Sequence, residues 1–332
     1  MKKIFVGLLV SIVFVYFSLR GVDFGKALEG LRSVQYAYVA PAVLLLLLIF
    51  WLRSLRWGII LPTAEHLPQR KLFPITCVGF MAIALFPMRL GELARPYLVS
   101  RKSGILFSPA LATIFIERVI DSLSLLLLLF LVMVKAPLPA WLTKTGYGLL
   151  TVFLLILLFV FLLYFNKGLP LKLLGPLLRR LPSSLREKAE HMVGSFADGF
   201  AVIGKPWRMG YILLLSLLIW GLSGVIIYLL FFSLHLSLPL TSAFVVLIVT
   251  IAGISLPTAP GLVGNFQFGC IVALSLFGVP KDSALAFSLV YYLVGIGLQI
   301  VLGLLFLPTL GISFRDMRKI GLSTQKSGQK SG

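Results

Sequence analysis

Residues 240–277, LTSAFVVLIVTIAGISLPTAPGLVGNFQFGCIVALSLF, form an almost unbroken apolar run that decides the fold. A membrane-spanning helix needs about 20 apolar residues, so this run is too long for a single crossing. Near its middle stand four residues that end or kink helices: Pro257, Pro260, Gly261 and Gly264. The stretch therefore predicts two helices joined by a turn within one apolar segment.

The rest of the chain has a similar composition. Of 332 residues, 59% are hydrophobic and 12% are charged, against about 25% charged in soluble domains. This excludes a soluble enzyme, a disulfide scaffold and a disordered protein, and the long apolar runs favour helices over a β-barrel. The net charge is +19. In so apolar a chain, we expect anionic phospholipid rather than nucleic acid as the partner.

Apolar segments cover approximately residues 4–19, 37–52, 72–88, 109–134, 146–165, 209–234, 240–277 and 284–307. Cytoplasmic loops of membrane proteins collect Lys and Arg. If every segment crosses the membrane once, the loop 53–71 is cytoplasmic, but more of the 30 basic residues lie outside than inside. If 72–108 enters and leaves from the cytoplasm, and 240–277 from outside, most basic residues become cytoplasmic. We therefore favour the second arrangement.

This topology predicts an all-α polytopic membrane protein with about six full spans and two re-entrant helical hairpins. Residues 1–312 form a single transmembrane domain, whose halves, about 1–136 and 146–312, repeat one element order in opposite orientation, as in many secondary transporters. Both termini are cytoplasmic, and residues 313–332 form a disordered tail. Prolines and glycines that merely kink ordinary spans are the alternative.

The cytoplasmic loop 166–208 is basic and amphipathic. Ser184 and Glu187 have the spacing of a capping box, and apolar residues then recur at helical intervals up to Ile203. We expect an interfacial helix on the anionic cytoplasmic leaflet. A solvated charged connector is the alternative.

Six charged residues lie where hydrocarbon is expected: Arg89, Glu92, Arg95, Glu117, Arg118 and Asp121. Each such charge costs about 2.5–3.5 kcal/mol on insertion scales, so these groups pair or line a wet cavity. Glu92 can bridge Arg89 and Arg95 at i,i+3. Glu117 and Asp121 share a helical face, where their charges repel unless a cation lies between them. Arg118 or an arginine of the first group can supply this cation.

Two interpretations of these charges stay open. In the first, Arg89, Arg95 and Arg118, with Tyr97 nearby, bind a lipid phosphate through their forked guanidinium groups. The carboxylates then orient the arginines, contact an amine headgroup or carry a proton. In the second, the charges form a self-satisfied network that fixes the first hairpin against the next helix.

The second hairpin has no charge at its tip, and its candidate residues are Pro257, Thr258, Pro260, Gly261, Gly264, Asn265 and Gln267. Half-helix ends and exposed amides can bind polar groups without a charged side chain; a plain turn is the alternative. We expect no catalytic residue, metal or cofactor. Cys77 and Cys270 lie in apolar segments, and the three histidines lack ligand spacing.

Three motifs in order resemble one family: Arg89-x-Gly91-Glu92-x-x-Arg95-Pro96-Tyr97-x-x-Ser100, Glu117-Arg118-x-x-Asp121 and Pro257-x-x-Pro260-Gly261-x-x-Gly264. Over about residues 4–312, the chain resembles the flippase-like, lysylphosphatidylglycerol synthase transmembrane region family. Two positions depart from the usual last motif: Leu262 stands where a second Gly is common, and Gln267 where a Glu is common. Gln267 cannot titrate, so the resemblance implies no proton carrier there.

The resemblance implies a multi-pass plasma (inner) membrane protein that moves or handles lipids, or lipid-linked sugars, between leaflets. In some members a soluble aminoacyl-transferase domain follows the membrane part. Because none follows here before Gly332, we do not expect lysyl transfer.

Three classes of function fit these features. The first is a flippase-like transporter of an anionic phospholipid or lipid-linked headgroup, without ATP hydrolysis because the chain has no Walker motif. The second is an intramembrane transferase with Glu92, Glu117 or Asp121 as base. The third is a non-transporting scaffold for a synthase or glycosyltransferase. We favour a transporter over an enzyme.

Overall fold

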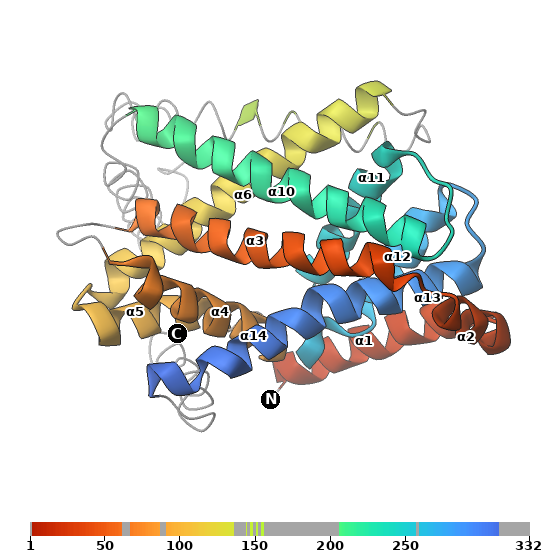
Figure 1. Ribbon diagram of the computed structural model, residues 1–332, viewed down its shortest axis with the longest axis horizontal. Coiled ribbons are helices and arrows are strands. Elements are labelled where there is room, and N and C mark those ends of the chain that lie inside the picture. The colour runs from red at the N-terminus through yellow and green to blue at the C-terminus, as the bar shows by residue number, and fades with distance from the viewer. Residues whose placement is uncertain are drawn as a thin grey trace, which may run out of the picture. The chain divides into compact units, whose positions relative to one another are not determined.

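The regular elements of the described chain are all helices. The computed structural model describes residues 2–61, 67–86, 91–135, 206–256 and 259–311, with a few isolated positions between 144 and 155 (Figure 1). Three of the described helices are long and apolar enough to cross a membrane: Tyr36–Ile60, Trp207–Ser233 and Lys281–Phe306. The prediction of an all-α chain with apolar spans is confirmed. The predicted interfacial helix and the predicted tail lie outside the described residues.

Most of the described helices follow the apolar segments of the sequence, whereas α2 and α5 lie outside them. They are α1 Lys2–Leu19, α2 Phe24–Arg32, α3 Tyr36–Ile60, α4 Gln69–Leu85, α5 Ala94–Ser103, α6 Phe107–Lys135, α10 Pro206–Ser233, α11 Leu240–Ser255, α12 Asn265–Ser275, α13 Lys281–Tyr292 and α14 Leu298–Phe306. A π-helical turn, Leu293–Gly297, joins α13 to α14. The division into inverted halves stays a prediction.

Contacts group the chain into two compact units. Unit 1 contains Met1–Leu55, Leu67–Gly104 and Leu218–Gly332, and unit 2 contains Arg56–His66 and Ile105–Leu217. The helices α3 and α10 each contribute residues to both units. Each unit is described by itself below.

One helix boundary corrects the sequence interpretation. The apolar segment 37–52 was expected to be followed by a cytoplasmic loop, but α3 continues to Ile60. Arg53 and Arg56 therefore belong to a helix and not to the loop 53–71. The helix continues because the side chain of Arg56, which is 1% exposed, lies among partners in the interior of unit 2.

Unit 1 contains two pairs of short helices, each interrupted where the sequence predicted a break. The pair α4 and α5 is separated by a turn of 3-10 helix at 91–93, and the pair α11 and α12 by the 3-10 turn Pro260–Leu262. In each pair the two helices pack against each other, and α4 also contacts the turn Pro260–Leu262. Helices of 10 to 17 residues are roughly 15–25 Å long, shorter than a hydrocarbon core of about 30 Å.

Glycines allow the close approach of these helices. A Cβ at Gly91 would lie 2.1 Å from the carbonyl carbon of Ala82, so the turn before α5 lies directly against the backbone of α4. A Cβ at Gly303 would lie 2.2 Å from the Cβ of Met81, which brings α14 equally close to α4. Small residues at helix interfaces of this kind are typical of membrane proteins.

The turn between α11 and α12 uses left-handed backbone at three positions. Gly261 has φ 83°, Gly264 has φ 88° and Leu262 has φ 59°. A left-handed conformation costs a non-glycine residue roughly 1–2 kcal/mol. This cost falls on Leu262, whereas Gly261 and Gly264 adopt such a backbone without it.

Candidate functional site

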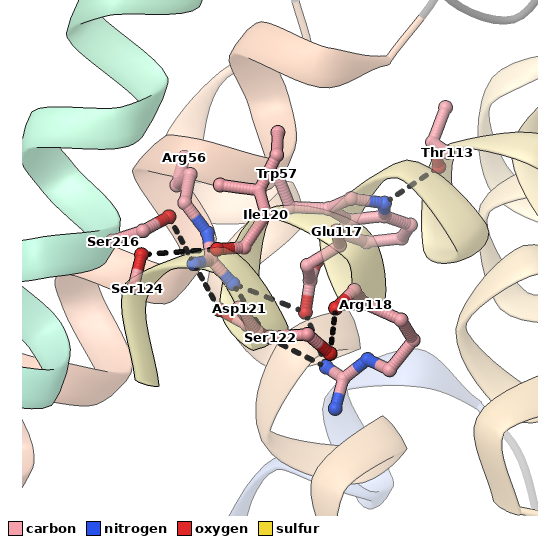
Figure 2. Close-up of polar contacts among 10 residues, drawn as sticks. All are labelled: Arg56, Trp57, Thr113, Glu117, Arg118, Ile120, Asp121, Ser122, Ser124 and Ser216. Atoms are coloured by element: carbon pink, nitrogen blue, oxygen red, sulfur yellow. Dashed lines mark hydrogen bonds and ion pairs between the residues drawn. The ribbon is translucent and has the colours of Figure 1, made fainter. Parts of the chain in front are cut away.

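Unit 2 contains a cluster of four charged side chains between helices, shown in Figure 2. We call Arg56, Glu117, Arg118 and Asp121 the charge cluster. Glu117 and Asp121 lie one turn apart on α6, with 0% and 5% of their surface exposed. Buried carboxylates one turn apart repel each other unless cations neutralise them.

Arg56 of α3 is the cation that holds both carboxylates. Its Nη1 lies 2.5 Å from Oδ1 of Asp121, and its Nη2 lies 3.3 Å from Oδ2 of the same carboxylate. The same Nη2 is 3.3 Å from Oε1 of Glu117. Nη1 also donates to the hydroxyl of Ser216 on α10, at 2.6 Å. The bidentate contact of Arg56 with Asp121 is the geometry in which an arginine binds a carboxylate most strongly.

Arg118 completes the cluster from the side that is less buried. Its Nη2 lies 2.8 Å from Oε1 of Glu117 and 3.3 Å from Oδ2 of Asp121. The contact with Asp121 at i,i+3 was predicted from the sequence. Arg118 is 31% exposed, whereas the side chains of the other three members are at most 7% exposed. The four formal charges of the cluster sum to zero. Arg118 lies at the edge of this neutral cluster, where its side chain is accessible.

The cluster is fixed in place by polar and apolar packing on both sides. Trp57, beside Arg56, donates from Nε1 to the hydroxyl of Thr113, at 3.0 Å, one helical turn before Glu117. Four buried isoleucines from α3, α6 and α10 pack together next to it: Ile60, Ile116, Ile120 and Ile212. Because this packing excludes water, the charge pairs are stronger than they would be at a surface.

Sequence reasoning did not find Arg56. Arg118 or an arginine of the first motif was expected to reach the two carboxylates. Arg118 does so, but the second cation comes from α3, 65 positions before Asp121. The signal was weak, because Arg56 stands just after an apolar segment, where a basic residue is usually a loop or interface residue. Only the continuation of α3 to Ile60 places it beside α6.

The helix pair α4–α5 and the turn before α5 hold the described residues of the first motif, which belong to unit 1. Arg95 is fully buried, and its guanidinium carbon lies 4.9 Å from the centre of the Phe80 ring. Arg53 lies 4.6 Å from the centre of the same ring, so two cations contact one aromatic side chain. Gly79 makes room for this, since a Cβ there would lie 2.1 Å from Cγ of Arg95.

Glu92 and Tyr97 of the first motif are more accessible than Arg95. Glu92 is partly buried in the turn before α5. The hydroxyl of Tyr97 accepts a hydrogen bond from Nη1 of Arg101, at 3.2 Å, one turn further along α5. Arg89 lies outside the described residues. Whether Glu92 bridges Arg89 and Arg95 stays a prediction.

The second hairpin has its amides bonded to the protein itself. Asn265 accepts from the hydroxyl of Ser11 on α1 at 3.3 Å and donates to the carbonyl of Gly253 at 3.2 Å. The Oε1 of Gln267 accepts from the backbone N–H of Gly264, at 2.8 Å, which caps α12. These two amides therefore fix the turn. Pro257 and Thr258 lie outside the described residues.

Two more contacts hold this turn in unit 1. The hydroxyl of Tyr292 donates to the carbonyl of Gly261 at 2.6 Å, just before the π-helical turn that follows α13. The backbone N–H of Ala259 donates to the hydroxyl of Ser11 at 2.8 Å. Among the described residues, no group of three or more His, Cys, Asp or Glu side chains could hold a metal ion.

Comparison with known proteins identifies the family. The family model of the lysylphosphatidylglycerol synthase transmembrane region matches residues 4–303. The chain belongs to this family. It is also similar to UPF0104 membrane proteins of two archaea, of which that from Methanocaldococcus jannaschii is 27% identical over 64% of this chain and 86% of the relative. That from Methanothermobacter thermautotrophicus is 26% identical over 88% of this chain and 91% of the relative. The chain is therefore a membrane protein, and its charge cluster lies in a membrane-protein fold.

Proposed function

We propose that the chain is a flippase-like protein that moves or handles an anionic phospholipid or a lipid-linked headgroup between the leaflets of the inner membrane. The charge cluster carries this proposal. It keeps two arginines and two carboxylates in an apolar packing of helices, where isolated charges are unstable. Charges that a membrane protein retains at such a cost usually serve a polar substrate.

Because Arg118 is the more accessible arginine of the charge cluster, we expect a lipid phosphate to contact it first. Its guanidinium already binds carboxylate oxygens, and phosphate oxygens fit the same fork of N–H donors. Arg118 can therefore exchange its carboxylate partners for the phosphate of a lipid. Arg56 remains behind to hold Glu117 and Asp121 and acts as a positioning residue. This exchange leaves one carboxylate charge to be balanced, so we expect a proton or an amine of the headgroup to enter with the phosphate.

The contacts of the carboxylates favour transport over a transferase reaction. A general base needs a carboxylate that is available to take a proton from the substrate. Both Glu117 and Asp121 lie within ion-pair distance of two arginines, so their oxygens are already engaged by cations. We assign them the role of holding the arginines.

The short helix pairs of unit 1 supply the second part of the proposal. We assign α4–α5 and α11–α12 to two re-entrant hairpins that enter from opposite sides, in inverted halves of the chain. Their lengths, their interruptions and the contact of α4 with the turn Pro260–Leu262 support this assignment. Irregular backbone at membrane depth is tolerated where it is buried or lines a cavity.

A lipid-movement assay tests the function. The full chain is reconstituted into liposomes with a trace of phosphatidylglycerol carrying a fluorophore on its acyl chain, and dithionite bleaches the outer leaflet. We expect bleaching beyond half of the fluorescence with wild-type protein. The Arg118→Ala variant should move the lipid about tenfold more slowly, because a hydrogen bond to a charged group contributes roughly 1.5–3 kcal/mol.

The matched control is Lys102→Ala, which removes one positive charge from an exposed position at the end of α5. This variant should move the lipid at the wild-type rate. Bleaching that stops at half in liposomes with folded wild-type protein would exclude unassisted translocation by this chain.

A further inference from the structure

Unit 1 contains a cavity of about 470 Å³ that is remote in sequence from the charge cluster. It lies between α1, α2, the turn before α12, and α13. Its lining residues are Val15, Ser18, Leu19, Phe24, Ala27, Leu28, Leu31, Val263, Gly264, Gln267, Leu285 and Leu289. The volume falls in the range of about 300–1,000 Å³ that is typical of small-molecule sites.

The two polar side chains of the lining are already bonded within the protein. The hydroxyl of Ser18 donates to the carbonyl of Phe14, at 2.7 Å. The Oε1 of Gln267 accepts from the N–H of Gly264, at 2.8 Å. A ligand that used the Ser18 hydroxyl hydrogen or Oε1 of Gln267 would compete with these bonds, whereas an apolar ligand leaves them intact. The cavity wall therefore selects hydrocarbon.

The turn between α1 and α2, beside the cavity, is held in place by specific contacts. Nζ of Lys281, at the start of α13, donates to the backbone carbonyls of Phe17 and Arg20 at the end of α1. The next residue, Asp282, accepts from the N–H of Asp23 at 2.7 Å. Asp23 in turn caps α2 by accepting from the N–H groups of the first turn. These contacts join the end of α1 to the starts of α2 and α13, so fixed helix ends bound the cavity.

The helix α2 gives the cavity its apolar entrance. Phe24, Ala27, Leu28 and Leu31 recur at helical spacing and all line the cavity, which makes α2 an amphipathic helix. Phe24 and Leu28 are 62% and 49% exposed. In a membrane protein, exposed apolar side chains beside an apolar cavity offer a path from surrounding lipid chains into the cavity.

We propose that this cavity binds one hydrocarbon chain of a membrane lipid, which enters past Phe24 and Leu28 and reaches the turn before α12. The hydrocarbon chain fills a space that is unfavourable for water, because nearly all lining side chains are apolar. The inference does not require the lipid to be translocated, and it stands independently of the role of Arg118.

Photolabelling tests the proposal. The full-length protein in detergent is titrated with phosphatidylglycerol that carries a diazirine in its acyl chain, irradiated, and digested for peptide mass spectrometry. We expect saturable labelling of lining residues such as Leu31 and Leu28. Leu44 on α3, which is 66% exposed and lies outside the lining, should be labelled without saturation. A single-chain lysophospholipid should compete, whereas glycerol phosphate, which is a headgroup without a chain, should not.

Two variants sharpen the result. Ala27→Phe fills the cavity from α2 and should lower labelling of Leu31 by about tenfold, the effect of losing a few buried methylene contacts. Leu28→Gln places a polar group at the entrance, at an exposed position that the fold tolerates, and should also lower it. Leu44→Phe should not change it. Labelling of Leu31 that is no more saturable than that of Leu44 in wild-type protein, or that glycerol phosphate competes away, overturns the proposal.

Discussion

Among single residues, Arg56 has the clearest energetic role. Replacing Arg56 with Gln leaves two buried carboxylates with Arg118 alone. Removal of one partner of a buried ion pair costs about 3–5 kcal/mol. We therefore expect Arg56→Gln to lower the free energy of unfolding by at least about 3 kcal/mol, measured by denaturant titration in mixed micelles.

A charge-balanced double variant separates this cause from lost packing. Arg56→Gln with Asp121→Asn leaves Glu117 paired with Arg118, so it should be more stable than Arg56→Gln alone. Arg101→Gln, at an exposed position of α5, should change the free energy of unfolding by less than about 1 kcal/mol. If the double variant is less stable than the single one, the carboxylate repulsion does not account for the loss.

The charge cluster also shows what the sequence can predict at single positions. The contact of Arg118 with Asp121 follows from helical spacing alone and is present in the structure. The contact of Arg56 with Asp121 depends on how two helices pack, which spacing along the chain does not contain. Likewise, Gly79 creates the space for Arg95 against Phe80, and no local pattern indicates that partner.

Among the helices, the first hairpin depends on the approach of its turn to α4. Gly91→Ala places a Cβ 2.1 Å from the carbonyl carbon of Ala82, and backbone atoms cannot move aside as a flexible side chain can. We expect this variant to lose at least about 2 kcal/mol of stability, within the range for overpacked cores. The measurement is the midpoint of thermal or denaturant unfolding.

Gly210→Ala is the matched control, because nothing lies within 4 Å of a Cβ at this position in α10. There, the better helix propensity of Ala should leave stability unchanged or raise it by up to about 1 kcal/mol. Equal effects of the two substitutions would show that the turn and α4 are not in close contact.

The turn of the second hairpin allows a comparison of two leucines. Leu262 and Leu274 are both buried, but only Leu262 has left-handed backbone. Substitution by Gly removes a buried side chain at both positions. At Leu262 it also relieves a backbone cost of about 1–2 kcal/mol, while in the helix α12 it adds up to about 1 kcal/mol. We expect Leu262→Gly to be the milder variant by about 2 kcal/mol in unfolding experiments, and a Leu274→Gly variant of equal stability would argue against strain in the turn.

Helix positions were predictable to a greater extent than side-chain partners. The apolar runs of α6 and α10, and the break between α11 and α12, follow from hydropathy and from Pro and Gly positions. The end of α3 was misplaced because Arg53 and Arg56 interrupt its apolar run. Charged residues end a run in hydropathy, but they do not end a helix when the fold gives them buried partners.

For the molecule as a whole, the proposed topology predicts the sidedness of four positions. In a Cys77→Ala/Cys270→Ala background, Arg70→Cys lies at the start of α4 and Lys102→Cys near the end of α5, while Ser237→Cys lies before α11 and Ser275→Cys at the end of α12. All four residues are exposed. The first two should react with an impermeant maleimide only from the cytoplasmic side, and the second two only from the opposite side. Reaction of Arg70→Cys and Lys102→Cys from opposite sides would show that α4–α5 crosses the membrane.

The most direct test of lipid handling at the charge cluster compares a lipid that has a phosphate with one that lacks it. Liposomes containing the reconstituted protein receive fluorescent phosphatidylglycerol or fluorescent glucosylceramide, and the two translocation rates are measured for wild type, Arg118→Lys and Arg118→Ala. We expect wild type to move phosphatidylglycerol faster, Arg118→Lys to keep part of that preference, and Arg118→Ala to lose it by slowing phosphatidylglycerol alone, about tenfold. Equal slowing of both lipids, or an unchanged preference in Arg118→Ala, would contradict the assignment of Arg118 as the phosphate-binding residue.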